Sequence, residues 1–152
     1  MMGRLVAELE SSPLVGLNPV IAKSTGIPTQ NPGQKLKDAV ERGMKLIVID
    51  PRRTETAEVA GEHVSIKPGG DVWLLLGMAH VITAAQGETP EAVQRIARGL
   101  GGIRHLFAQC TPEAVAARAG VPAAQIRALA DDFAAAKWAV ADGRLGVSQT
   151  TH

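Results

Sequence analysis

A short apolar run placed directly after a helical pattern constrains the fold of this chain more than any other feature. The run covers Lys45–Ile49 (KLIVI) and ends at the carboxylate of Asp50. The preceding helix is predicted to begin at Pro32, with Asn31 as its N-cap, and to stop at Gly43. Buried strands of parallel sheets are apolar without alternation, and helices connect them. The pattern therefore predicts an α/β protein, and we expect a three-layer, Rossmann-like domain with a small parallel sheet.

The other elements expected in the first half of the chain are less regular. Segment 11–33 is rich in Pro and Gly and is expected to be a long irregular connection, with only a very short strand at Leu14-Val15. A further strand is expected over Val64–Ile66. A helix capped by Asp71 should run to about Ala85, and because it is apolar on nearly all sides it should be buried. A chain of 152 residues is predicted to form one domain, residues 1–152.

The second half of the chain is predicted to be mostly helical. Two helices share the same start, a Thr N-cap followed by Pro and Glu. Thr89 begins the first, whose apolar stripe extends to Leu100, and Thr111 begins the second, which ends at Gly120. The elements expected after these are a helix at about 123–136, a short strand at Trp138–Val140 and a Gly-containing loop at Gly143–Gln149.

Composition excludes several classes of partner and site. Lys plus Arg total 16 and Asp plus Glu total 15, so the net charge of +1 gives no electrostatic case for nucleic acid. Cys110 is the single cysteine; alone it holds no iron–sulfur cluster or zinc ion, and it is expected to be a small buried hydrophobe. No residue is predicted to be catalytic or to bind a metal, since the histidines lack metal spacing and His80 fits a hydrogen-bonded core position. We expect no signal peptide, no membrane span and a cytoplasmic location.

Asp50 is the first candidate for ligand binding. It lies at the carboxyl end of the predicted strand, where open α/β sheets bind nucleotides, and its carboxylate can accept hydrogen bonds from a ribose or a base edge. The alternative is an Asp-Pro turn that only ends the strand. Arg52 follows closely, and its guanidinium suits a phosphate or a base plane, with a simply solvated arginine as the alternative.

Asp71 is the second candidate, because it follows the turn Pro68-Gly69-Gly70. Glycines let a backbone approach a ligand closely. The carboxylate of Asp71 suits guanine, whose N1–H and N2 amine are adjacent donors, and the alternative is a helix N-cap. A weaker candidate is the GLNP segment, in which Gly16 and Asn18 form either a phosphate-binding turn or an ordinary one. Together these candidates predict a nucleotide-bearing cofactor.

Taken in order, these segments resemble the molybdopterin oxidoreductase family, which includes formate dehydrogenases, periplasmic-type nitrate reductases and dimethyl sulfoxide reductases. The resemblance covers nearly the whole chain, and its most specific part is IDPRRTETA followed by a PGxD turn. The matching segments are Gly16–Pro19 (GLNP), Gly43–Ala57 (GMKLIVIDPRRTETA), Ile66–Asp71 (IKPGGD), Thr111–Ala134 (TPEAVAARAGVPAAQIRALADDFA) and Gly143–Gln149 (GRLGVSQ).

The resemblance implies a molybdenum or tungsten ion held on two molybdopterin guanine dinucleotides, whose nucleotide ends lie on Rossmann-like domains. This chain would correspond to one such domain, with the remaining domains of a larger oxidoreductase as partners. The cofactor-binding residues implied by position are Gly16 and Asn18 beside the phosphates, Asp50 and Arg52 on the nucleotide, Ile49 and Pro51 around its pocket, and Gly69 and Asp71 at the guanine.

Departures from the family lead us to expect that the chain alone is inactive. The family's metal ligand lies N-terminal to the GxNP segment, and no residue before Gly16 suits that role. The family's cluster-binding cysteines are absent as well. We therefore predict an internal fragment of a larger enzyme. Two alternatives remain open: a stand-alone, non-catalytic nucleotide-binding module and a non-functional truncated remnant.

Overall fold

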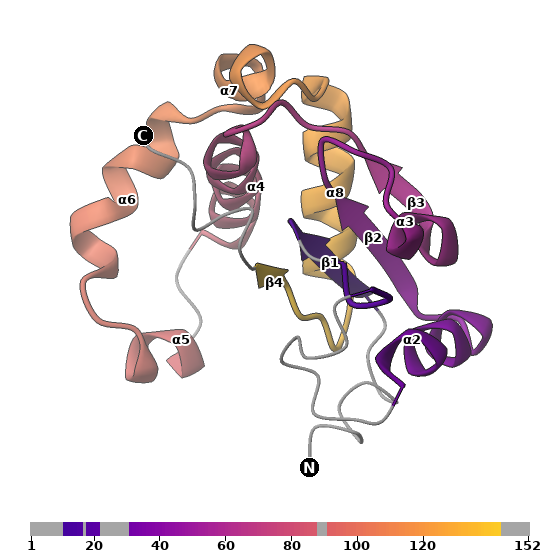
Figure 1. The fold of residues 1–152 in the computed structure, drawn as a ribbon. Coiled ribbons are helices and arrows are strands. Elements are labelled where there is room, and N and C mark those ends of the chain that lie inside the picture. Colours follow the sequence, from indigo (N-terminus) through magenta and orange to yellow (C-terminus); the bar gives the residue numbers. More distant parts are fainter. Residues whose placement is uncertain (1–10, 17, 22–30, 88–90, 144–152) are drawn as a thin grey trace. The chain divides into compact units, whose positions relative to one another are not determined.

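The computed structural model describes residues 11–16, 18–21, 31–87 and 91–143, which fall into two compact units (Figure 1). The first unit comprises Met1–Gly69 together with Ala135–His152, and the second comprises Gly70–Ala134. All described strands belong to the first unit, and the described elements of the second unit are helices. The prediction of a single domain over 1–152 stays a prediction, since compact units can be parts of one domain.

Four strands form the sheet of the first unit: β1 (Ser11–Val15), β2 (Lys45–Ile49), β3 (Gly61–Val64) and β4 (Asp142–Gly143). Their order across the sheet is β3-β2-β1-β4, and all the pairings are parallel. This is the strand order of one half of a Rossmann fold. The predicted α/β class with a small parallel sheet is confirmed, and β2 has the predicted bounds. Helices α4 to α8 belong to the other unit, so the three-layer order itself stays a prediction.

Two helices of the first unit, α2 (Pro32–Glu41) and α3 (Glu55–Ala60), lie beside one another, and α3 packs on β2 and β3 (Figure 1). α2 begins as predicted, because the Asn31 side chain accepts a hydrogen bond from the Gln34 N–H. Alternate strand residues join both helices in one core, and each buried aliphatic side chain contributes roughly 1.5–3 kcal/mol. The residues of this core are Leu14, Leu36, Ala39, Met44, Leu46, Val48, Ala57 and Ala60.

The second unit consists of α4 (Asp71–Gln86), α5 (Glu91–Ile96), α6 (Leu100–Gln109), α7 (Pro112–Ala119) and α8 (Ala123–Ala135). α7 and α8 match their predictions. The Thr111 side chain caps α7 by accepting a hydrogen bond from the Ala114 N–H at 3.2 Å, and Gly120 ends the helix in the left-handed region with φ 75°. α4 packs on α6 and α7.

Two strands lie earlier in the chain than predicted. β1 begins at Ser11 and not at Leu14, so part of the segment expected to be irregular is strand. β3 covers Gly61–Val64 and not Val64–Ile66. The reason is the short helix α3, which was not predicted: its C-cap Gly61 adopts φ 79°, and the chain turns there directly into the strand that pairs with β2.

The last strand was predicted in the wrong place. Trp138–Val140 was expected to be strand, whereas β4 is Asp142–Gly143 and pairs with the end of β1. The side chain of Trp138 is 55% exposed. Within the predicted strand only Ala139 forms a β-bridge, and the paired strand begins at Asp142. The rest of the predicted loop 143–149 lies outside the described residues after Gly143.

The helix predicted from Thr89 to Leu100 is wrong in its length and in its buried stripe. Thr89 lies outside the described residues, α5 ends at Ile96, and Leu100 begins a separate helix, α6, that was not predicted. Gly99 separates the two helices with φ 77°, a left-handed conformation that glycine adopts at no steric cost. Ile96 is 82% exposed and Val93 is 37% exposed, so the predicted stripe does not enter a core.

The start and the burial of α4 also differ from prediction. The N-cap is Gly70, no side chain caps the helix, and Asp71 is its first residue and is buried. The prediction that Asp71 caps this helix is therefore wrong, because the glycine before it already takes the cap position. α4 is not buried on all sides either, since Leu75 is 38% exposed. None of the helices in the described parts of the chain is long and apolar enough to cross a membrane.

Candidate functional site

The carboxyl edge of the sheet is formed by one row of paired residues. Val15 of β1 pairs with Ile49 of β2 and with Gly143 of β4, and Ile49 pairs in turn with Val64 of β3. The order of the strands reverses between β1 and β4. In open α/β sheets, ligands bind outside the carboxyl ends of the strands at such a switch point. The backbone thus places a candidate site at this edge, where Gly16 and Asp50 follow β1 and β2.

Gly16 and Asp50 directly follow two neighbouring strands, and neighbouring strands of a sheet lie roughly 4.8 Å apart. The Gly16 N–H donates a hydrogen bond of 3.0 Å to the Ile49 carbonyl, and Gly16 has φ 59° in the left-handed region. Ile49 itself is fully buried. Its carbonyl therefore joins the two loops, and its side chain contributes to the core beneath them.

Asp50 is half-buried and keeps its loop in shape. Its backbone N–H donates to the Val64 carbonyl at 3.2 Å, and its Oδ1 accepts from the Arg52 N–H at 2.8 Å. His63 Nε2 lies 2.9 Å from the Asp50 carbonyl oxygen. Since a carbonyl can only accept, this nitrogen carries the proton. One carboxylate oxygen thus has a structural role in the turn, as the alternative interpretation expected, while Pro51 and Arg52 are exposed.

Asn18 is held by residues of α3 that sequence reasoning did not single out. Thr56 Oγ1 donates to Asn18 Oδ1 at 2.6 Å, and Asn18 Nδ2 donates to Glu55 Oε2 at 2.8 Å. Thr56 Oγ1 also accepts from the Val20 N–H at 3.2 Å. Thr56 is fully buried, whereas Glu55 is exposed. The loop after β1 is therefore tied to the start of α3 by side chains.

The signal that could have identified α3 and its contacts is the sequence TETA. Thr54 is the N-cap of α3 and accepts a hydrogen bond from the Ala57 N–H at 3.3 Å. A Thr followed by acidic residues is typical of a helix start. A hydrogen bond from its own backbone N–H, and then the amide of Asn18, lower the pKa of the Glu55 carboxyl, and the charge of Arg52 acts in the same direction.

The residues predicted for the guanine end, Gly69 and Asp71, belong to different units. Gly69 has φ 76° and belongs to the first unit, whose segment Met1–Gly69 ends there. Asp71 belongs to the second unit and is 5% exposed. The structure therefore places Gly16, Asn18, Asp50 and Arg52 on one sheet edge. That Asp71 serves the same ligand stays a prediction.

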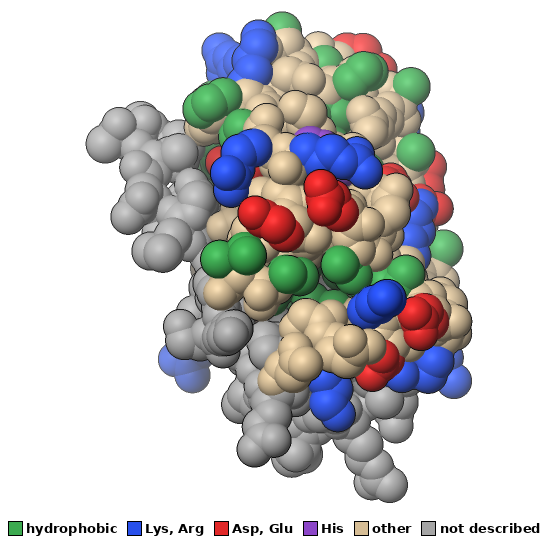
Figure 2. Space-filling model, turned by 45° about the vertical axis from the view of Figure 1, so that its right-hand side comes forward, with side chains coloured by type: hydrophobic (Ala, Val, Ile, Leu, Met, Phe, Trp, Pro, Cys, Tyr) green, Lys and Arg blue, Asp and Glu red, His purple; other side chains and the backbone are tan. Residues whose placement is uncertain are grey.

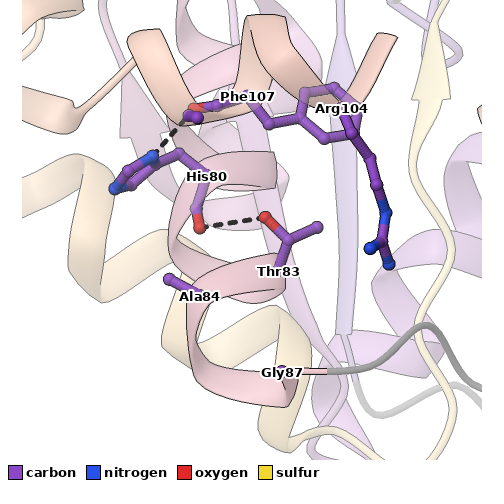
Figure 3. A pocket seen from close by; sticks show the side chains of 7 residues that line it. His80, Thr83, Ala84, Gly87, Arg104 and Phe107 are labelled. Atoms are coloured by element: carbon purple, nitrogen blue, oxygen red, sulfur yellow. Dashed lines mark hydrogen bonds between the residues drawn. The ribbon is translucent and has the colours of Figure 1, made fainter. Parts of the chain in front are cut away.

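A separate hollow of about 270 Å³ lies in the second unit (Figure 3). His80 of α4 contacts α6 there, with Nδ1 2.8 Å from the Phe107 carbonyl oxygen, and Figure 3 shows the Arg104 side chain extending away from α6. His80 is hydrogen-bonded as predicted, but it is half-buried beside the hollow and not in a core; Cys110 is buried as predicted. Among the described residues, no group of three or more His, Cys, Asp or Glu side chains could hold a metal ion. The hollow is lined by His80, Thr83, Ala84, Gly87, Arg104, Phe107 and Ala108.

The surface in Figure 2 carries basic and acidic side chains interspersed, with hydrophobic side chains between them. This face shows no broad area of one sign, in keeping with a net charge of +1. The prediction that the chain does not bind nucleic acid stays a prediction.

Comparison with known proteins gives the chain its relatives, although no family model matches it. Over 112 residues, 74% of the chain, it is 37% identical to formate dehydrogenase H of Escherichia coli (strain K12). It is 36% identical over 101 residues, 66% of the chain, to the molybdopterin-containing subunit PhsA of thiosulfate reductase from Salmonella typhimurium. The solved structure of acetylene hydratase from Pelobacter acetylenicus matches 95% of the chain with a TM-score of 0.77 and 28% identity.

The homologues of this chain are molybdopterin oxidoreductases. The resemblance found in the sequence is therefore confirmed. The chain spans only a small part of these enzymes: 16% of formate dehydrogenase H, 13% of the thiosulfate reductase subunit and 20% of the acetylene hydratase chain. As a molybdopterin oxidoreductase homologue, it carries one Rossmann-type half sheet with its switch point.

Proposed function

We propose that this chain supplies a nucleotide-binding part of a molybdenum or tungsten oxidoreductase, and that the carboxyl edge of its sheet binds the nucleotide end of a molybdopterin guanine dinucleotide. One observation carries the proposal. Gly16 and Asp50 follow two neighbouring parallel strands, beside the switch point between β1 and β4, in a chain whose homologues are molybdopterin oxidoreductases. Ligands of open α/β sheets bind at that place.

The chemistry of the residues at this edge fits the nucleotide end of such a cofactor. Asp50 offers a carboxylate to ribose hydroxyls, and the exposed guanidinium of Arg52 suits phosphate oxygens. Gly16 has no side chain to keep a phosphate away from its loop. Asn18 adds an amide N–H donor. Ile49 and Pro51, on either side of Asp50, are proposed to shape the pocket of the nucleotide. When bound, the cofactor supplies the metal at which the larger enzymes react.

The guanine end is proposed to meet Gly69 and Asp71. A carboxylate accepts hydrogen bonds from the adjacent N1–H and N2 amine of guanine. Asp71 is buried and stands in the first turn of α4, a position at which acidic side chains are common. Gly69, with φ 76°, lets the backbone turn just before this residue.

Titration with guanosine diphosphate by calorimetry tests the proposal. We expect the wild-type chain to bind and Asp50→Asn to bind at least about tenfold more weakly, because hydrogen bonds to charged groups contribute roughly 1.5–3 kcal/mol. Asparagine keeps an oxygen for the Arg52 N–H, so the turn should survive. Asp38→Asn in α2 is the matched control, since Asp38 bonds Gln34 within its own helix. No binding by the wild-type chain at millimolar nucleotide would overturn the proposal.

We also propose that the chain alone has no redox activity. It functions together with the remaining domains of a larger enzyme in the cytoplasm. The purified chain, supplied with cofactor and molybdate, should give no turnover of formate, nitrate or sulfoxides with a dye as electron partner. Reproducible turnover would contradict this part of the proposal and leave nucleotide binding to be judged by the titration.

A further inference from the structure

The amide of Asn18 has only one orientation that suits its neighbours. Thr56 Oγ1 accepts the Val20 N–H, and its single hydrogen is then free to be donated. It is donated to Asn18 Oδ1 at 2.6 Å. The Glu55 carboxylate can only accept, and it receives a hydrogen of Asn18 Nδ2 at 2.8 Å.

The opposite orientation would be unfavourable on both sides. If the amide turned over, Oδ1 would face the Glu55 carboxylate, where two acceptors repel each other. The Thr56 oxygen could then accept a hydrogen of Nδ2 with its second lone pair, but the buried hydroxyl hydrogen would lose Asn18 Oδ1 as its acceptor. The acceptor-only carboxylate of Glu55 thus selects the orientation, and the buried hydroxyl of Thr56 favours the same one. The backbone N–H of Glu55 itself, and then the Asn18 amide, lower the pKa of the Glu55 carboxyl.

This selected orientation has a consequence for an anionic ligand. Asn18 Nδ2 carries two hydrogens, and the hydrogen bonds among the described residues use one of them. The oxygen of the amide, which would repel a phosphate, is occupied by Thr56. A ligand that approaches this loop therefore meets an N–H donor.

We propose that Thr56 and Glu55 are positioning residues that hold the Asn18 amide with its second N–H available to a phosphate oxygen of the nucleotide. This inference rests on the proposed function and names residues that act through Asn18. The link joins side chains 37 and 38 residues apart, so the loop after β1 takes its binding shape only when α3 is in place.

The test compares guanosine diphosphate with guanosine, which lacks the phosphates. Thr56→Val keeps the shape of the buried side chain and removes the hydroxyl; we expect diphosphate affinity to fall about threefold to tenfold, as for a lost hydrogen bond. Guanosine affinity should stay unchanged. Thr56→Ser restores the hydroxyl and should restore the diphosphate affinity. A merely structural role of Thr56 would lower both affinities together.

Glu55→Gln gives a second arm that cannot fail through loss of the core, since Glu55 is exposed. It should lower diphosphate affinity about twofold to fivefold, because the charge that selects the amide orientation is gone. Glu58→Gln removes the same charge from the same helix and should have no effect. Equal effects of the two variants would overturn the proposal, because the loss would then be one of general charge.

Nuclear magnetic resonance separates this proposal from the proposed function. In the ligand-free chain, both side-chain amide hydrogens of Asn18 should shift in Thr56→Val and Glu55→Gln but not in Glu58→Gln. Unchanged Asn18 signals would overturn the positioning role even if the nucleotide binds. If the Asn18 signals shift but the wild-type chain binds no nucleotide, the hydrogen bonds to Thr56 and Glu55 are confirmed. The proposed function is then overturned, and the role of these hydrogen bonds in binding is overturned with it.

Discussion

The two units of the chain use buried apolar residues differently. In the first unit, every second residue of the strands packs with two helices in one core. Polar groups gather at the carboxyl edge of the sheet. In the second unit, helices approach closely around Gly77, while apolar side chains of α5 and α6 such as Ile96 and Ile103 stay exposed. The sheet fixes positions through backbone pairing, whereas the helices depend on side-chain fit. Substitutions of polar groups at the sheet edge should therefore affect binding, and substitutions where helices approach closely should affect packing.

The largest expected effect is at Gly77. A Cβ atom there would lie 2.8 Å from Val115 Cγ2 and 3.1 Å from Ile126 Cγ2, and β-branched side chains cannot easily turn away. Gly77→Ala should lower the free energy of unfolding by about 1–3 kcal/mol, as in other overpacked cores. Chemical denaturation measures this change.

Gly102→Ala is the matched control in the same unit. An added Cβ meets nothing within 4 Å, and Gly102 lies within α6. It should raise the stability by up to about 1 kcal/mol, because alanine costs less entropy in a helix. If both variants moved stability in the same direction, close packing at Gly77 would not be the cause.

Asp71→Asn should separate the two ends of the nucleotide. The substitution replaces one carboxylate oxygen, which would accept a hydrogen bond from guanine, by an NH₂ donor, and it removes the negative charge. Affinity for guanosine diphosphate should therefore fall about tenfold to a hundredfold. Affinity for adenosine diphosphate should stay nearly unchanged, because adenine lacks the two adjacent donors. Asp50→Asn should weaken both nucleotides equally. Equal losses for both nucleotides in Asp71→Asn would remove Asp71 from guanine recognition.

The two threonine caps offer a comparison of the units at smaller magnitude. Thr54→Ala and Thr111→Ala each remove an N-cap hydrogen bond, which contributes roughly 0.5–2 kcal/mol. The bond of Thr54 to Ala57 is buried and that of Thr111 to Ala114 is exposed. Thr54→Ala should therefore cost more, because water cannot replace the lost partner. Thermal melts measure both, and the Ser variants at each position should lie close to the wild type.

The smallest expected effects are the pH dependences of two exposed glutamates. The pKa of Glu55 is lowered by its own backbone N–H and by Asn18, and that of Glu113 is lowered chiefly by Arg127 at 2.6 Å. Because both values lie below the ordinary 4.5, each contribution is complete above that pH and is lost as the pH falls through the lowered pKa. The stability difference between wild type and Glu55→Gln or Glu113→Gln should shrink in acid.

Salt distinguishes these two contributions. The bond of Glu113 to Arg127 joins two exposed charges and should weaken with added salt, whereas Glu55 bonds a neutral amide. Added salt should therefore reduce the stability loss of Glu113→Gln more than that of Glu55→Gln. Thermal melts at low and high ionic strength measure both losses. The reverse order would contradict the assigned partners.

The sequence by itself determined the elements whose signals are local. The β2 run, the Asn31 cap of α2 and the Thr111 cap of α7 depend on neighbouring residues, and each is found where the sequence predicted it. The position of Asp50 at the end of β2 followed for the same reason. The local pattern was misread at Gly61, which ends the unpredicted helix α3, and at Gly99, which begins the unpredicted helix α6.

Only the tertiary structure decided which loops meet. Parallel strands pair residues far apart in the chain, so the order β3-β2-β1-β4 and the place of β4 could not be read from periodicity. The same holds for Asn18, whose partners Glu55 and Thr56 lie 37 and 38 residues away. Their meeting depends on β1 pairing in register with β2, which puts both loops on one edge. A cap or a turn is fixed by nearby backbone atoms, whereas this hydrogen-bond network exists only once the sheet has formed.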